Sequence, residues 1–265
     1  MLTIKDRKDN YRQLKLSPIN LDEYDKISET ANKNPRSYFK FFNHNRICYY
    51  QYNSFQYSES EKMFMDSLFT LVPNNRTKVL ILDLRFNGGG NSSMGDYLLN
   101  YLTSKPYVMY SKVDIKLSEQ LFKKGRYQDY KDLGGLIFTY QSEPKHPKDS
   151  GNKFTGKLIV MTSPFTFSSA ADLASVIKDY KLGIIIGEET GGIRQSFGDI
   201  LSFQTPNYKV RFGVSYKYFY APVPKPDDEN HGTLPDIYIT DEILKKYPNS
   251  TDPVFDFVMD YIKND

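Results

Sequence analysis

Two adjacent serines, Ser168 and Ser169, stand where a strand pattern gives way to a helix pattern. The apolar run at residues 157–162 predicts a buried strand, and Leu173 and Val176 follow at helical spacing. A serine hydroxyl at a helix N-terminus suits nucleophilic attack, because the helix dipole stabilises a forming alkoxide and the next amide can bind an oxyanion. Serine is also a favoured helix N-cap, so the junction by itself is compatible with both roles.

Three consecutive glycines, Gly88, Gly89 and Gly90, follow a second predicted strand at residues 78–84. Because they have no side chains, their N–H groups can approach a ligand closely and bind a phosphate or an oxyanion. The phosphate role is disfavoured, since the chain has neither a Gly-Lys-Ser/Thr ending here nor a G-x-G-x-x-G pattern. A tight strand-to-helix turn uses the same residues, so this loop alone is also ambiguous.

The composition excludes several classes of protein. Of 265 residues, 39% are hydrophobic and 25% are charged, and the net charge is +3, so we expect a globular core and no nucleic-acid partner. The single cysteine, Cys48, excludes an internal disulfide and a cysteine-based zinc site. No apolar run approaches the ~20 residues that a membrane span needs. The first ten residues lack the charged-then-apolar layout of a secretion signal.

Strand and helix patterns alternate along most of the chain. Strands are predicted at residues 47–52, 78–84, 157–162 and 182–187, helices at 59–72, 92–102 and 168–180, a hairpin at 200–216, and a final helix that begins at Asp252 or Pro253. This alternation predicts an α/β core domain over residues 47–265, with a mostly parallel central sheet flanked by helices. Residues 1–46 are expected to form a polar extension with a short helix near residues 21–31.

Four segments together resemble the signatures of the carboxyl-terminal processing (tail-specific) serine proteases. In chain order they are V-L-I-L-D-L-R-F-N-G-G-G, T-F-S-S-A-A-D, I-I-I-G-E-E-T-G-G and L-P-D-I. The resemblance covers about residues 47–265 and implies a ClpP/crotonase-like core that hydrolyses peptide bonds, often near the C-terminus of a protein substrate. It further implies a protein or peptide partner, no metal or organic cofactor, and a location outside the cytoplasm.

The resemblance also assigns roles to residues. The nucleophile of the family is the serine of the second segment. Counting back without gaps from Gly187 identifies Ser168, whereas alignment on the acidic residue Asp172 identifies Ser169, and we expect Ser168 to be the nucleophile. The backbone donors of the oxyanion hole would be Gly89, Gly90 and Ser169, and the supporting residues would be Thr190 and Asp179.

The chain departs from the family at the general base. Most members have a lysine three residues after the threonine, but this chain has Ile193, followed by Arg194, which is a poor base. An upstream histidine used by relatives of the tricorn type is replaced by Gln51. A serine nucleophile needs a proton acceptor within hydrogen-bond reach, and His44 and His231 are the weak remaining candidates.

The sequence therefore predicts a serine-type endopeptidase. The missing lysine favours an alternative, a catalytically inactive homologue that acts as a peptide-binding or scaffold module. A second alternative is an acyl-thioester-binding protein of the crotonase type, which the serine motif disfavours. The hairpin at residues 200–216 either packs on the core or offers an edge to which an extended peptide adds as a strand. The sequence specifies neither the substrate nor the oligomeric state.

Overall fold

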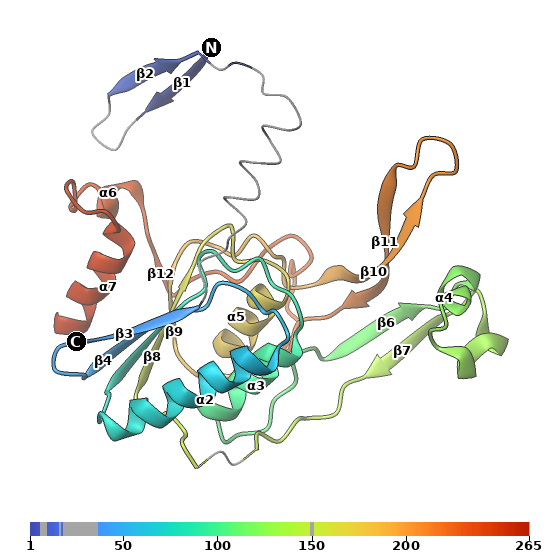
Figure 1. The fold of residues 1–265 in the computed structure, drawn as a ribbon, viewed down its shortest axis with the longest axis horizontal. Coiled ribbons are helices and arrows are strands. Elements are labelled where there is room, and N and C mark those ends of the chain that lie inside the picture. Colours follow the sequence, from blue (N-terminus) through green and yellow to red (C-terminus); the bar gives the residue numbers. More distant parts are fainter. Residues whose placement is uncertain (6–9, 16, 18–36, 149–150, 265) are drawn as a thin grey trace.

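A six-stranded sheet lies at the centre of the computed structural model, which describes residues 1–5, 10–15, 17, 37–148 and 151–264 (Figure 1). Its strands, in spatial order, are β12 (Ile237–Tyr238), β9 (Ile184–Gly187), β8 (Lys157–Thr162), β5 (Val79–Asp83), β4 (Ile47–Gln51) and β3 (Tyr38–Phe42). The first five of these run parallel to one another, and β3 pairs antiparallel with β4.

Both faces of this sheet are buried, because alternate side chains of each strand point to opposite sides. One face packs against α2 (Glu59–Asn74), α3 (Ser93–Leu102) and α5 (Ser169–Asp179), and the other against α6 (Asp241–Leu244) and α7 (Pro253–Asn264). On β5, Leu80 and Leu82 contribute to the first core, whereas Ile81 contributes to the second. Burying each of these side chains stabilises the fold by about 1.5–3 kcal/mol, which explains the continuous apolar runs in the sequence.

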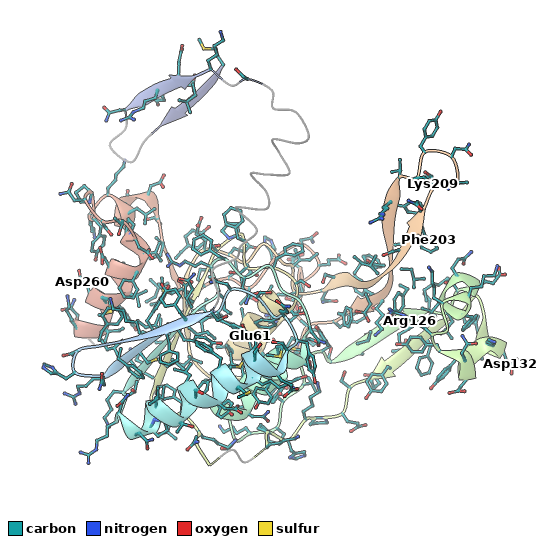
Figure 2. All side chains as sticks on the ribbon, viewed as in Figure 1. Glu61, Arg126, Asp132, Phe203, Lys209 and Asp260 are labelled. Carbon is teal, nitrogen blue, oxygen red and sulfur yellow. The ribbon has the colours of Figure 1, made fainter. Side chains whose placement is uncertain are left out.

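A second, antiparallel sheet extends away from the core (Figure 1). Its strand order is β10 (Ser196–Gln204), β11 (Arg211–Phe219), β6 (Lys112–Lys116) and β7 (Ile137–Gln141). Between β6 and β7 lie α4 (Glu119–Lys123) and a 3₁₀ helix (Gln128–Leu133). Figure 2 shows Phe203 and Lys209 along the projecting β10–β11 hairpin. The sheet has an apolar cluster of its own, and Tyr110 packs against both this cluster and the main core.

The predicted α/β architecture with a mostly parallel, helix-flanked sheet is confirmed. Residues 1–46 were expected to form an extension ahead of the core, but β3 pairs with β4 along its whole length, so Tyr38–Phe42 belongs to the central sheet. The short helix expected near residues 21–31 lies outside the described residues. The described N-terminal residues form a two-stranded sheet of β1 (Leu2–Lys5) and β2 (Tyr11–Leu14), which the sequence analysis did not predict.

The described residues contain no helix that is both long and apolar enough to cross a membrane. They also contain no group of three or more His, Cys, Asp and Glu side chains arranged to hold a metal ion. Cys48 is a free thiol that is fully buried in the main core, and burial raises its pKa to about 12.

Candidate active site

The serine turn and the glycine loop lie in direct contact. The glycines follow β5 and the serines follow β8, and these neighbouring parallel strands end at the same edge of the sheet. Thr166 joins the two segments, because its buried hydroxyl donates to the carbonyl oxygen of Leu84 at 2.9 Å. A β-carbon built on Gly89 would lie only 2.7 Å from the β-carbon of Ser168. The chain thus brings together two loops that are about eighty residues apart in the sequence.

The two serines differ in what their hydroxyl groups do. Ser168 is the N-cap residue of α5, yet its side chain makes no capping hydrogen bond. It is exposed, and its backbone has φ +50° and ψ −133°, a conformation that a non-glycine residue rarely adopts. Ser169 is buried, and its hydroxyl donates to the carbonyl oxygen of Gly90 at 2.9 Å. Among the residues that the structure describes, the hydroxyl of Ser168 therefore has no hydrogen-bond partner, whereas that of Ser169 holds the glycine loop.

A cavity of about 630 Å³ opens beside Ser168. The glycine loop, the start of α5, β10 and β11 all contribute to its wall. Its polar groups include Ser92 and Asp172, and its apolar surface includes Phe197, Ile200 and Phe219. A cavity of this size can hold several residues of an extended peptide next to the serine hydroxyl.

The backbone amides next to Ser168 are not equivalent. The amide of Gly89 donates to Oδ1 of Asn87 at 2.9 Å, so the expectation that Gly89 supplies an oxyanion donor is wrong for this geometry. The amides of Gly90 and Ser169, both in the cavity wall, have no hydrogen-bond acceptor within the part of the chain that the structure describes. Gly90 has φ +140°, and a β-carbon there would lie 2.5 Å from the carbonyl oxygen of Phe55, so only glycine fits.

Asn87 organises this loop, although the sequence analysis gave it no role. Its side chain is fully buried, accepts from the Gly89 amide, and donates from Nδ2 to the carbonyl oxygen of Tyr52 at 2.8 Å. Its own carbonyl oxygen accepts from the amide of Phe167 at 3.0 Å, next to Ser168. An asparagine directly before three glycines could have indicated this role in the sequence. The carbonyl oxygen of an asparagine side chain can accept a hydrogen bond from a backbone N–H of such a turn.

We expect the Asn87→Ala variant to lose about 1–3 kcal/mol of unfolding free energy, since the variant leaves a buried donor and a buried acceptor without partners. Urea unfolding followed by circular dichroism measures this change. Asn91→Ala is the matched control, because the Asn91 side chain accepts a single exposed hydrogen bond from the Ser93 amide. A loss for Asn87→Ala no larger than that of the control would contradict the organising role.

Neither predicted histidine reaches Ser168. His44 lies in the turn between β3 and β4, before the amino end of β4, whereas Ser168 follows the carboxyl end of the parallel strand β8. The two residues are therefore at opposite edges of the sheet, separated by a strand length of about 16 Å. His231 is largely exposed, and its Nδ1 lies 3.3 Å from Oε1 of Glu189 outside the cavity of Ser168. Both weak base assignments are corrected on this ground.

The residues at the position of the family lysine are structural. Ile193 forms an isolated bridge with Gly232, and Arg194 is buried. The Arg194 guanidinium donates to Asp228 at 2.6 Å and to Asp179 at 2.7 Å. Asp179 stands at the last turn of α5, about 16 Å along the helix from Ser168. It therefore acts within this ion-pair network and does not touch the nucleophile.

Thr190 stabilises a neighbouring turn that packs on Ser168. Its buried hydroxyl donates to the carbonyl oxygen of Gly192 and accepts from the amide of Thr233, each at 2.8 Å. A β-carbon on Gly192 would lie 2.9 Å from the backbone nitrogen of Ser168, so the Gly191–Gly192 turn packs directly on that residue. Thr190 thus fixes the shape of the Gly191–Gly192 turn, and this turn positions Ser168.

Ion pairs of Arg85 connect the start of the glycine loop to Asp252, the residue before α7. Arg85 donates to Asp83 and to both carboxylate oxygens of Asp252, with distances of 2.6–3.1 Å. Burial alone would raise the pKa of Asp252, but the hydrogen bonds and charge of Arg85 lower it below its usual value. The network holds the backbone that leads into Asn87.

One carboxyl group in the cavity wall received no role in the sequence analysis. Asp172, one turn along α5, accepts a hydrogen bond from the Tyr110 hydroxyl to Oδ2 at 2.7 Å. Removal from water raises its pKa to about 7, although the hydrogen bond from Tyr110 acts in the opposite direction. Burial also raises the pKa of Tyr110 well above its ordinary value, and the nearby Asp172 carboxylate adds to that shift.

The mostly parallel sheet with helices on both of its faces is a ClpP/crotonase-like core, the fold class that the sequence predicts. The sequence model of peptidase family S41 matches residues 46–239, and the chain belongs to that family. The resemblance seen in the four sequence segments is thereby confirmed. No curated protein matches the chain.

Three solved structures illustrate the shared fold. A protein of Parabacteroides merdae, provisionally described as a peptidase, is 19% identical, with a TM-score of 0.55 over 89% of this chain and 69% of that one. Mature CPAF is 16% identical, with a TM-score of 0.55 over 87% of this chain and 55% of its own. A lipoprotein from Streptococcus agalactiae is 16% identical, with a TM-score of 0.51 over 91% and 74%. The chain thus spans little more than half the length of mature CPAF.

Proposed function

We propose that this chain is a serine-type endopeptidase in which Ser168 attacks the carbonyl carbon of a peptide bond. The observation that carries the proposal is the strained, exposed Ser168 at the start of α5, which lines the cavity and whose hydroxyl is not used as a helix cap. Strain at a single residue persists where the surrounding structure enforces it, and such residues cluster at active sites.

The oxyanion of the tetrahedral intermediate would be bound by the amides of Gly90 and Ser169. Both border the cavity, and the Ser169 amide belongs to the first turn of α5, where N–H groups have no partner within the helix. Each preorganised donor of this kind typically contributes about 10²–10³ to kcat. The partial positive charge of the helix N-terminus adds to their effect.

The substrate would bind as an extended peptide along β10. In the described part of the chain, β10 pairs with β11 on one side only, so its other edge is open. Ser196, Phe197 and Gly198 of this strand line the cavity that contains Ser168. A peptide that added to this edge would gain main-chain hydrogen bonds, and its side chains would contact the apolar surface of Phe197 and Ile200.

The second candidate function is that of an inactive peptide-binding module, and Ile193 at the position of the family lysine is the observation in its favour. A fluorophosphonate probe separates the two functions, because it reacts only with an activated serine. We expect one probe molecule per chain, mapped to the peptide that contains Ser168. The absence of labelling at every pH between 5 and 10, in protein that is folded by circular dichroism, would establish the module instead.

A further inference from the structure

The proposed serine nucleophile needs a proton acceptor, and no histidine or lysine lines its cavity among the described residues. Two carboxylates do line it, Asp172 and Asp199. Asp199 forms an ion pair with Lys217 at 2.6 Å, and this positive partner weakens its ability to accept a proton. Asp172 has no such partner, since its one hydrogen-bond donor within the described chain is the neutral hydroxyl of Tyr110.

Asp172 is also placed correctly with respect to Ser168. It lies four residues further along the chain, and its amide donates to the Ser168 carbonyl oxygen at 3.0 Å, which closes the first turn of α5. Side chains on a helix tilt toward its N-terminus, which for α5 is the end where Ser168 lies, and both residues line the same cavity. Tyr110 occupies Oδ2 of the carboxylate, which leaves Oδ1 to accept from another group in the same cavity.

We propose that Asp172 is the general base and acid of this site, held in position by Tyr110. The inference rests on the proposed peptidase function. In the acylation step, the proton of the Ser168 hydroxyl passes to the Asp172 carboxylate as Oγ bonds to the peptide carbonyl carbon, and the carbonyl π electrons become the oxyanion. The Asp172 carboxylic acid then protonates the leaving nitrogen as the C–N bond breaks. In deacylation, Asp172 takes a proton from the attacking water and returns it to Ser168.

The surroundings of Asp172 suit a base that works near neutral pH. Tyr110 contacts it from the segment before β6, and the charge of Asp96 on α3 raises the pKa of Tyr110. Asp199 of β10, which forms an ion pair with Lys217 of β11, lines the same cavity. The carboxyl group has a pKa of about 7, because burial disfavours its charged form. Asp172 is then ionised above pH 7, so the rate should fall about tenfold for each pH unit below that value.

The test measures the rate of fluorophosphonate labelling against pH in three proteins: wild type, Asp172→Asn and Asp172→Glu. We expect the labelling rate of Asp172→Asn to be about 10²–10⁴-fold lower than that of wild type at pH 8. Its pH profile should also lack the acidic limb, which is the fall in rate below about pH 7. Asp172→Glu should recover part of the rate, because it restores a proton acceptor. The matched control is Asp66→Asn, since Asp66 also accepts from a tyrosine hydroxyl, that of Tyr97 at 2.6 Å, but lies between α2 and α3 outside the cavity.

Tyr110→Phe gives a readout that a purely structural role would not produce. The Tyr110 hydroxyl stabilises the ionised carboxylate, so its removal should raise the pKa of Asp172 and move the acidic limb to higher pH. Tyr97→Phe is the corresponding control and should leave the limb in place.

Urea unfolding separates lost chemistry from lost structure. In the folded chain the Asp172 carboxyl keeps its proton up to about pH 7, whereas in the unfolded chain it releases it near 3.8. Protonation of Asp172 therefore contributes to the unfolding free energy of wild type at low pH, and this contribution is lost as the pH rises between those values. The unfolding free energy of Asp172→Asn should not show this decrease, and the variant should remain folded at pH 8.

The outcomes distinguish the two proposals. If wild type is not labelled at any pH, the peptidase function itself fails. If wild type is labelled, and folded Asp172→Asn keeps the wild-type rate and pH profile, the peptidase function stands and the role of Asp172 is overturned.

Discussion

Replacing Ser168 with alanine is expected to abolish fluorophosphonate labelling and to reduce peptide hydrolysis by about 10⁶-fold. The size of the effect follows from the removal of the only atom that forms the acyl-enzyme, since variants of other serine peptidases without the nucleophile retain only the contributions of binding and the oxyanion hole. The measurement is intact-protein mass spectrometry after exposure to the probe, together with cleavage of a quenched fluorescent peptide library.

Ser169→Ala is the matched control for this variant. The Ser169 hydroxyl donates to Gly90 and is buried, so its loss should cost about 1 kcal/mol of unfolding free energy while labelling continues. The reverse result, with labelling lost in Ser169→Ala and kept in Ser168→Ala, would move the nucleophile to Ser169. It would also revive the alignment on Asp172 that the sequence left open.

Replacing Gly89 with alanine is expected to reduce the labelling rate by at least about 10³-fold. A β-carbon at this position would lie 2.7 Å from Cβ of Ser168 and 2.8 Å from the carbonyl oxygen of Phe167, and the backbone has φ +95°. The contact would push the nucleophile and the glycine loop apart. Because a misplacement of about 1 Å alone costs roughly 10²-fold, and displacement of the neighbouring Gly90 amide from the oxyanion costs a further 10²–10³-fold, the two effects together are large.

The neighbouring glycine provides a sharp control. A β-carbon on Gly88 meets no atom of the described residues within 4 Å, and the backbone of Gly88 has no positive φ, so Gly88→Ala should keep nearly the full labelling rate. The rates of both variants are measured with the same probe under saturating and limiting conditions. Equal rates for the two variants would show that the glycine loop does not set the position of Ser168.

Much of the fold was predictable from the sequence because it depends on local patterns. The strands β4, β5, β8 and β9 are short apolar runs, and burial on both faces of a parallel sheet requires such runs. The turn at Pro206 correctly separated β10 from β11. The strands β6 and β7 were not predicted. Most of β7 faces solvent, so its residues show no buried period, whereas Val113 and Ile115 of β6 are buried at alternate positions.

The candidate site was predictable only in part. The sequence by itself determined that a serine begins a helix and that three glycines follow a strand, because these features depend on residue type and local spacing. It could not determine which serine hydroxyl is free, that the Gly89 amide is occupied by Asn87, or that His44 and His231 lie away from the cavity. Those facts depend on which strands become neighbours and on where each one ends.

Asp172 shows most clearly what the sequence determined and what depended on the tertiary structure. The sequence placed it on the first turns of α5, and the tertiary structure added the hydroxyl of a tyrosine sixty-two residues earlier in the chain and a position in the wall of the cavity beside Ser168. The acidity of a carboxyl group is set by solvation and by the groups that contact it, and packing between distant segments decides both. Residue types and their local spacing thus determined which groups are present, and the tertiary structure decided which of them lie close enough to react together.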